Sequence, residues 1–312
     1  MLDNYLIVAK QVLILFILIG VGVICAKAKL LTREAVKSLA NVVLIFATPC
    51  VIIRSFAQDP TPERLQNLGF AALASLGVHL LGIGLVHLLI RDKDRARRCV
   101  LQYGAVFSNA GYMALPLQQA ILGNDGVFYG SVYVAVFNLV MWTYGVAIMS
   151  GGAKSLSPRK ILLNPGVIGV VLGLAVLFFF GSEFNGDALP LLYAPINHIA
   201  NLNTPLPMLI IGFYLANAPI MKALKDKSSY LTIVLRLAVI PLLSLGGLWL
   251  CGLRGTVLVS VVIGASAPVA TATTMLATRY ERDTDLSVNI VVLSTLLSIL
   301  TMPLIVGLAQ TL

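Results

Sequence analysis

Charged residues are scarce in this chain. Only 11% of the 312 residues are Asp, Glu, Lys or Arg, whereas 58% are hydrophobic and the mean hydropathy is +0.93. A soluble domain carries about 25% charged residues, so this composition cannot cover a water-facing surface. Because helices satisfy their own backbone hydrogen bonds in lipid, the sequence predicts an all-α membrane protein.

Acidic residues and catalytic patterns are scarcer still. All 13 Asp and Glu residues lie in termini, loops or span edges, and the sequence contains no HExxH, CxxC or paired-carboxylate pattern. We therefore expect no enzyme, no cofactor and no metal site, and a sodium or proton site built on a carboxylate is disfavoured. A loose pairing of a serine with His79 leaves an embedded hydrolase as a remote alternative.

Ten apolar windows of about 20 residues are long enough to cross a bilayer as helices. We expect the first to be retained as a helix rather than cleaved as a signal peptide. The ten predicted spans are Tyr5–Ala26, Ala35–Ala57, Leu65–Ile90, Arg98–Leu122, Gly126–Ser150, Ile161–Gly181, Leu189–Ala216, Ser229–Cys251, Gly255–Thr278 and Leu286–Gln310.

Basic residues alternate strongly between the two sets of loops. Of the 22 Lys and Arg residues, 17 fall on one side and 3 on the other. The positive-inside rule then places the basic loops in the cytoplasm and both termini outside, in a multi-pass protein of the cell membrane. Since the net charge of +9 sits in these loops, no nucleic-acid partner is expected.

Proline motifs recur at a spacing of about half the chain. Thr48-Pro49 in the second span recurs as Thr204-Pro205 in the seventh, and Pro116 in the fourth span matches Pro268 in the ninth. We interpret Pro49 and Pro205 as helix breaks. Two five-span halves, 1–156 and 157–312, must insert with opposite orientations because five is odd, which predicts an inverted repeat typical of secondary transporters.

The fourth and ninth spans carry Gly, Pro and small polar residues at mid-membrane depth. A helix broken there exposes N–H and C=O groups, which is tolerated only inside protein or beside a hydrated cavity. If the broken helices cross, their half-helix N-termini favour an anion. The alternative is that Asn109 and Ser266 bind no substrate and only form hydrogen bonds between neighbouring helices. The candidate binding residues are Asn109, Gly111, Tyr112, Pro116, Ser266, Pro268, Val269, Ala270 and Thr271.

Four motifs in order along the chain resemble the auxin efflux carrier family: 109–116, 134–142, 267–270 and 292–298. The resemblance implies a scaffold domain (spans 1, 2, 6, 7), a transport domain (spans 3–5, 8–10), a homodimer and elevator-type alternating access. It implies a substrate at the crossover of spans four and nine, and adds Asn138 to the site. The ten-residue connection from Gly151 to Lys160 is shorter than in the plant exporters, which puts auxin itself in doubt as the substrate.

Two basic side chains lie inside spans. His79 could be a packed core histidine or a proton-sensitive element, and Arg236 could snorkel to the interface or attract anions. The expected function is transport of a small organic anion, such as an auxin-like carboxylate or a dicarboxylate. A proton-coupled malate or malonate carrier and a channel are the alternatives.

Overall fold

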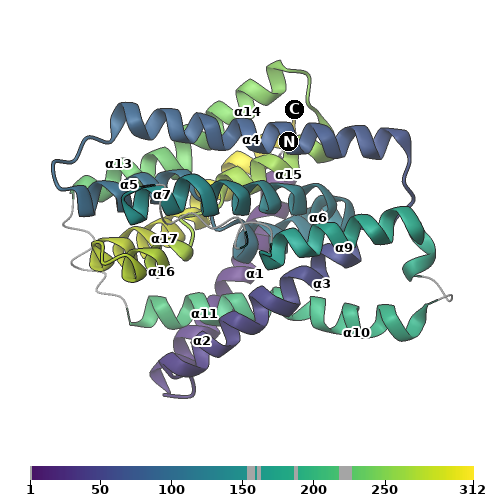
Figure 1. The fold of residues 1–312 in the computed structure, drawn as a ribbon, viewed down its shortest axis with the longest axis horizontal. Coiled ribbons are helices and arrows are strands. Elements are labelled where there is room, and N and C mark those ends of the chain that lie inside the picture. The colour runs from purple at the N-terminus through teal and green to yellow at the C-terminus, as the bar shows by residue number, and fades with distance from the viewer. Residues whose placement is uncertain (1, 153–158, 160–162, 186–188, 218–226) are drawn as a thin grey trace.

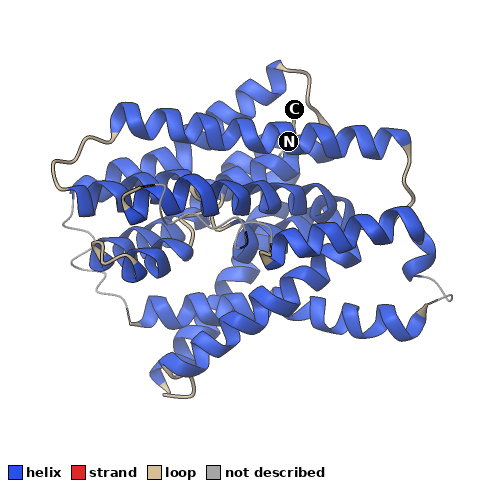
Figure 2. Cartoon of the chain, in the orientation of Figure 1, coloured by secondary structure: helices blue, strands red, loops and turns tan. Residues whose placement is uncertain are grey.

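The computed structural model describes residues 2–152, 159, 163–185, 189–217 and 227–312. Every regular element in these ranges is a helix (Figure 2). The longer α-helices are α1 (Leu2–Lys27), α2 (Arg33–Val42), α4 (Pro62–Leu89), α5 (Arg95–Val106), α6 (Leu115–Val140), α9 (Pro165–Phe179), α10 (Pro190–Ala200), α11 (Pro205–Ala216), α14 (Ile240–Leu250), α15 (Gly255–Ser266) and α17 (Thr284–Ala309). The shorter ones are α3 (Thr48–Ser55), α7 (Val146–Ser150), α13 (Lys227–Val234) and α16 (Ala272–Arg279).

Seven helical stretches of the described residues are long and apolar enough to cross a membrane. The longest, Ala110–Ser150, is interrupted at Gly123, where a φ of 63° turns the chain. The helices α9 and α15 are apolar but shorter. The expected all-helical membrane protein is therefore confirmed.

Polar residues fix where the helices begin. Thr61 accepts a hydrogen bond from the Arg64 N–H at the start of α4, and Pro62 fills the first helical position, where no N–H is needed. Asn164 caps α9 in the same way through the Gly166 N–H. The starts of α4 and α9 lie within a few residues of the starts of the third and sixth predicted spans.

The helix α1 crosses the molecule and packs against α11 and α17, while α3 packs against α9 and α10 (Figure 1). Two glycines permit the contact between α1 and α11. A Cβ on Gly22 would lie 2.6 Å from the Leu209 carbonyl oxygen, and a Cβ on Gly212 would overlap the Ile19 carbonyl. Backbones therefore approach closely here, as small residues allow in membrane helices.

Large apolar side chains cover the outer surfaces of these helices. Ile17 and Ile24 on α1 and Leu73 on α4 are each at least 60% exposed. In lipid such side chains meet acyl chains rather than water. The interior holds the polar residues, including Ser75, His79, Arg236 and Ser266, each at most 1% exposed.

The two expected helix breaks differ: Pro49 lies inside a continuous helical stretch, whereas Pro205 begins a new helix after a break. The stretch Arg33–Ser55 stays helical because a π-helical turn at Val43–Ala47 precedes Pro49. By contrast, α10 ends at Ala200, and a short 3₁₀ turn at Asn201–Asn203 separates it from α11, which begins at Pro205. Such turns rearrange the hydrogen bonds around a residue that lacks an N–H.

Candidate substrate site at a helix crossover

Two helices are broken in the middle of the protein. After α5 the chain is not helical over 107–109, and after α15 it is not helical over 267–270; each break begins with extended backbone, at Phe107 and at Ala267. Ser108 and Val269 pair as an isolated antiparallel bridge, and both are fully buried. The fourth and ninth predicted spans are thus broken, and their breaks lie against each other.

Backbone hydrogen bonds join the two breaks. The Asn109 N–H donates to the Pro268 carbonyl oxygen at 2.7 Å, and the Ala270 N–H donates to the Phe107 carbonyl oxygen at 2.9 Å. A third N–H, on Val269, donates to the Ser294 hydroxyl of α17 at 3.1 Å. These bonds satisfy groups that each break removes from its helix.

Asn109 carries an unsatisfied donor at this junction. The residue precedes the helix that restarts at Ala110, it is 4% exposed, and its side-chain Nδ2 has no hydrogen-bond partner among the described residues. A Cβ placed on Gly111 would meet nothing within 4 Å, so there is open space beside the same turn. A buried amide donor without a partner is costly unless a ligand or water fills the space.

Arg236 holds the other ends of the broken helices. Its Nη1 donates to the carbonyl oxygens of Ala105 and Val106 at 3.1 and 2.9 Å, and its Nη2 donates to that of Ala265. The side chain is fully buried, so the expectation that it snorkels is wrong. A cation at two helix C-termini complements both dipoles; both of its Nη groups are engaged by these carbonyls, whereas its Nε has no partner among the described residues.

His79 lies beside the crossover rather than in it. Its Nδ1 is 2.7 Å from the Ser75 carbonyl oxygen, and its Nε2 has no partner among the described residues. The ring lies 5.1 Å from that of Tyr133, whose hydroxyl is 3.4 Å from the Ser108 hydroxyl. His79 is therefore one aromatic neighbour away from the bridged backbone.

The other predicted site residues divide between the junction and its surroundings. Ser266 donates to the Ile263 carbonyl of its own helix at 3.1 Å, which is a structural bond. Thr271 precedes α16 at the second break. Tyr112 is 7% exposed and packs in an apolar cluster with Met208 and Ile263.

Asn138 lies against a different element. Its Nδ2 donates to the Val134 carbonyl at 2.9 Å, and a Cβ on Gly166 would come within 2.6 Å of that nitrogen. The side chain therefore packs at the start of α9, and its expected contact with a substrate stays a prediction.

A small polar cavity of about 80 Å³ lies beside Pro116. The end of α3, the start of α6 and the turn before α11 surround it. The lining residues are Val51, Arg54, Leu115, Pro116, Gln119, Ala200, Asn201, Asn203 and Thr204. The two Thr-Pro motifs meet here, because the Thr48 hydroxyl donates to Asn203 Oδ1 at 2.8 Å.

Arg54 is the cation that lines this cavity, and the sequence alone did not identify it as a candidate site residue. Its Nη1 donates to Asn197 Oδ1 at 2.9 Å and Asn201 Oδ1 at 2.8 Å, and its Nη2 donates to Gln119 Oε1 at 3.1 Å. All three acceptors are neutral amides, and no described acid lies within ion-pair distance of Arg54. Its position near the end of a span made it resemble an outer-loop residue.

Comparisons with known proteins agree with this architecture. A family model described as "Membrane transport protein" matches residues 7–158 and 153–306. An uncharacterized transporter of Methanothermobacter thermautotrophicus is 24% identical over 95% of this chain and 96% of its own length. An uncharacterized transporter of Methanocaldococcus jannaschii is 25% identical over 94% of this chain and 96% of its own.

A Rhizobium meliloti protein named "Putative malonate transporter" is 24% identical over 93% of this chain and 92% of its own length. These proteins and the family are transporters and not enzymes. The resemblance to auxin efflux carriers is confirmed at the level of the family. The chain is a multi-pass membrane transporter that belongs to the membrane transport protein family of auxin efflux carriers.

Proposed function

We propose that this protein is a secondary transporter that carries a small organic anion through the helix crossover. The observation that carries the proposal is the join between two broken helices, where the Asn109 amide donor is buried without a partner. Discontinuous helices that meet inside a membrane protein are the typical substrate site of secondary transporters.

The charges around the crossover favour an anion. Helices restart after the breaks at Ala110 and Ala272, and a helix N-terminus carries partial positive charge. Arg54 adds a full positive charge beside Pro116, and the side chains that accept its hydrogen bonds among the described residues are neutral amides. A substrate carboxylate could accept from Asn109 or Arg54, because a charged partner makes a stronger hydrogen bond than a neutral amide.

The proposed layout is ten spans in two inverted five-helix repeats. The Gly123 turn divides Ala110–Ser150 into two spans, and α9 and the broken pair α15–α16 supply two more. The matched family ranges meet at 153–158, near the proposed repeat boundary of 156 and 157. We further propose external termini, cytoplasmic basic loops in the cell membrane, and a homodimer.

An elevator movement fits the position of the cavity. Its walls come from α3 and the turn before α11, which belong to the proposed scaffold, and from the start of α6, which belongs to the proposed transport domain. A substrate held there would lie between a fixed and a moving part. The hydrogen bonds from Arg54 to the side-chain amides of Asn197 and Asn201 stay within the proposed scaffold. The hydrogen bond to Gln119 joins the proposed scaffold to the proposed transport domain.

A dicarboxylate is a reasonable substrate class, since the Rhizobium meliloti relative is named for malonate. We propose that the anion moves alone, without a coupled ion; the alternative is a proton-coupled carrier of malonate or malate. The observation in its favour is His79, which has an unpartnered Nε2 one aromatic ring from the crossover.

Thermal unfolding with a panel of ligands tests the proposed substrate class. Purified protein is heated with malonate, malate or indole-3-acetate, and with glucose and choline as neutral and cationic controls. We expect at least one anion to raise the unfolding midpoint, because a ligand that binds only the folded state stabilises it. Stabilisation by glucose or choline, or by none of the anions, would contradict the proposal.

The variant Arg54→Gln tests the cation. Glutamine keeps a polar side chain beside the cavity but removes the positive charge. We therefore expect the anion to bind at least about tenfold more weakly, equivalent to about 1.4 kcal/mol. Arg64→Gln is the control, because Arg64 bonds the Asp59 carbonyl at the surface. Equal effects of the two substitutions would argue against a role for Arg54.

A further inference from the structure

A second basic cavity, far along the chain from Arg54, lies where α4 ends and α5 begins. It measures about 560 Å³ and is lined by His87, Ile90, Arg91, Asp92, Lys93, Arg98 and Gln102. Three of these side chains are cations and one is an acid. The cavity is not part of the crossover described above.

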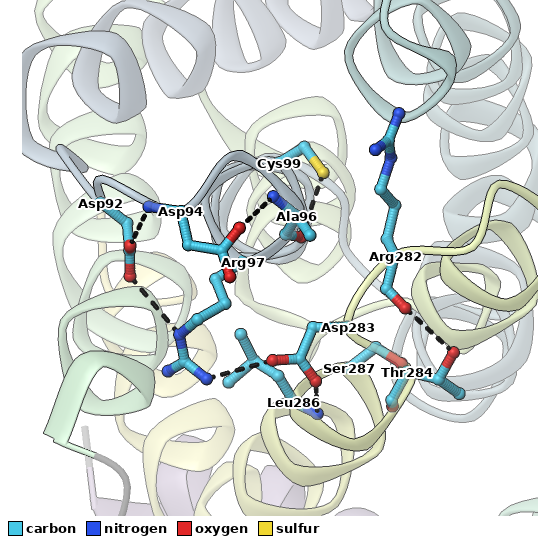
Figure 3. Close-up of polar contacts among 10 residues, drawn as sticks. All are labelled: Asp92, Asp94, Ala96, Arg97, Cys99, Arg282, Asp283, Thr284, Leu286 and Ser287. Carbon is cyan, nitrogen blue, oxygen red and sulfur yellow. Dashed lines mark hydrogen bonds and ion pairs between the residues drawn. The ribbon is translucent and has the colours of Figure 1, made fainter.

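The acid of this cavity is already engaged. Arg97 Nε lies 3.6 Å from Asp92 Oδ2, and the Asp94 N–H donates to Asp92 Oδ1 at 2.9 Å (Figure 3). Arg97 also donates to Asp283 Oδ2 at 3.1 Å, which ties this loop to the start of α17 (Figure 3). The loop between α4 and α5 is therefore held in place, and the Asp92 carboxylate is paired with Arg97 rather than with the cations that line the cavity.

The cations of the cavity are not neutralised. Arg91 and Lys93 form no hydrogen bond or ion pair with any other described residue, and Arg98 donates only to the Asp92 carbonyl oxygen, at 3.2 Å. Three positive charges around one cavity repel one another, and an anion between them relieves this repulsion. Phosphate oxygens suit such a site because Arg and Lys donate several hydrogen bonds to them.

The position of the cavity indicates where the phosphate comes from. Leu88 and Leu89, in the last turn of α4, are 59% and 43% exposed, as expected of side chains that face acyl chains. Next to them the His87 and Tyr144 rings pack at a tilt of 54° with centroids 5.8 Å apart, and tyrosine is enriched at the interface between lipid and water. The cavity thus lies where an apolar surface changes into a basic loop.

We propose that this cavity binds the headgroup phosphate of an anionic phospholipid, with Arg91, Lys93 and Arg98 as the binding residues. The acyl chains would lie along the exposed leucines of α4. Basic residues directly beside a membrane helix attract anionic lipids, each contributing to affinity at the membrane surface. The site is independent of the substrate that the crossover carries.

The test uses delipidated full-length protein in a non-ionic detergent. Phosphatidylglycerol, phosphatidylcholine or inorganic phosphate is added, bound lipid is counted by native mass spectrometry, and the unfolding midpoint is measured. We expect phosphatidylglycerol to bind and to raise the midpoint more than phosphatidylcholine. The double variant R91A/K93A should lose at least tenfold in affinity for phosphatidylglycerol.

The matched control is K27A/K29A, which removes two exposed lysines from another basic loop. It should bind phosphatidylglycerol as the wild type does. Equal binding of the two lipids, equal losses in both double variants, or no loss in R91A/K93A would overturn the proposal. An effect of inorganic phosphate that phosphatidylglycerol does not exceed would also overturn it, because the ligand would then be a free phosphate.

Discussion

The Asn109 N–H donates to the Pro268 carbonyl oxygen at 2.7 Å, across 159 positions of sequence. This bond joins two breaks that are separate in sequence and makes them one structural unit. The Asn109 side chain is positioned by the same contact, since its backbone cannot move without losing a buried hydrogen bond. The unpartnered Nδ2 is therefore held at the junction.

Replacing Asn109 with alanine should weaken substrate binding without unfolding the protein. The lost donor to a charged ligand is worth about 1.5–3 kcal/mol, or roughly 10- to 150-fold in affinity. Ligand titration followed by thermal shift measures the effect. Asn217→Ala is the control, because Asn217 is exposed and its side chain donates to the Phe213 carbonyl of its own helix, away from the crossover. A folded Asn109→Ala protein with unchanged affinity would make Asn109 purely structural.

Arg236→Met should destabilise the protein by at least about 3 kcal/mol, because it leaves three buried carbonyl groups without a donor. Unfolding in mixed micelles measures the change. Arg254→Met is a suitable comparison, since Arg254 also donates to carbonyls near a helix end but is exposed. That substitution should cost less than about 1 kcal/mol. Similar losses would show that the two capping arginines contribute equally.

Gly212→Ala should separate α1 from α11. The added Cβ overlaps the Ile19 carbonyl, and backbone cannot rotate away as a side chain can. Overpacking of this kind costs about 1–3 kcal/mol. Gly20→Ala on α1 adds the same methyl group where nothing lies within 4 Å, so it should be neutral. Equal unfolding midpoints for both variants would refute the close contact.

Accessibility of single cysteines tests the proposed topology. In a background with the four native cysteines replaced, Lys93→Cys should resist an impermeant thiol reagent added to intact cells, and Glu63→Cys should react with it. Both positions are exposed on the protein, so burial does not explain a difference. The reverse pattern would place the basic loops outside and invert the proposed orientation.

The sequence predicted an all-helical membrane protein correctly, because lipid demands long apolar helices with a distinct hydropathy signal, while the count of ten spans stays a prediction beside the seven long apolar stretches of the described residues. The breaks at 107–109 and 267–270 were predictable to within several residues, since glycine, proline and small polar residues rarely share a mid-membrane segment, although the chain is already helical again at Pro116. Pro49 carries a similar local signal but stays helical, because a π turn precedes it, whereas one helix does end just before Pro205 and another begins at it.

Contacts between distant residues were not predictable. Arg236 was expected to snorkel to the interface or to attract anions, because the sequence does not reveal that the carbonyls of Ala105, Val106 and Ala265 converge on it. Arg54 was overlooked for the same reason, since its three amide acceptors come from α6, α10 and the turn after α10. In both cases the partners lie at least 29 positions away in sequence.

Counterflow in proteoliposomes with an imposed potassium-diffusion potential tests the central claim most directly. Vesicles are loaded with unlabelled malonate and the uptake of labelled malonate is followed. We predict saturable uptake that is stimulated by internal malonate, that is weakened in Asn109→Ala, and that responds to the potential, since one charge moved through 100 mV is worth about 2.3 kcal/mol. Linear uptake without counterflow, unchanged in Asn109→Ala, would contradict a transporter that carries an anion at the crossover.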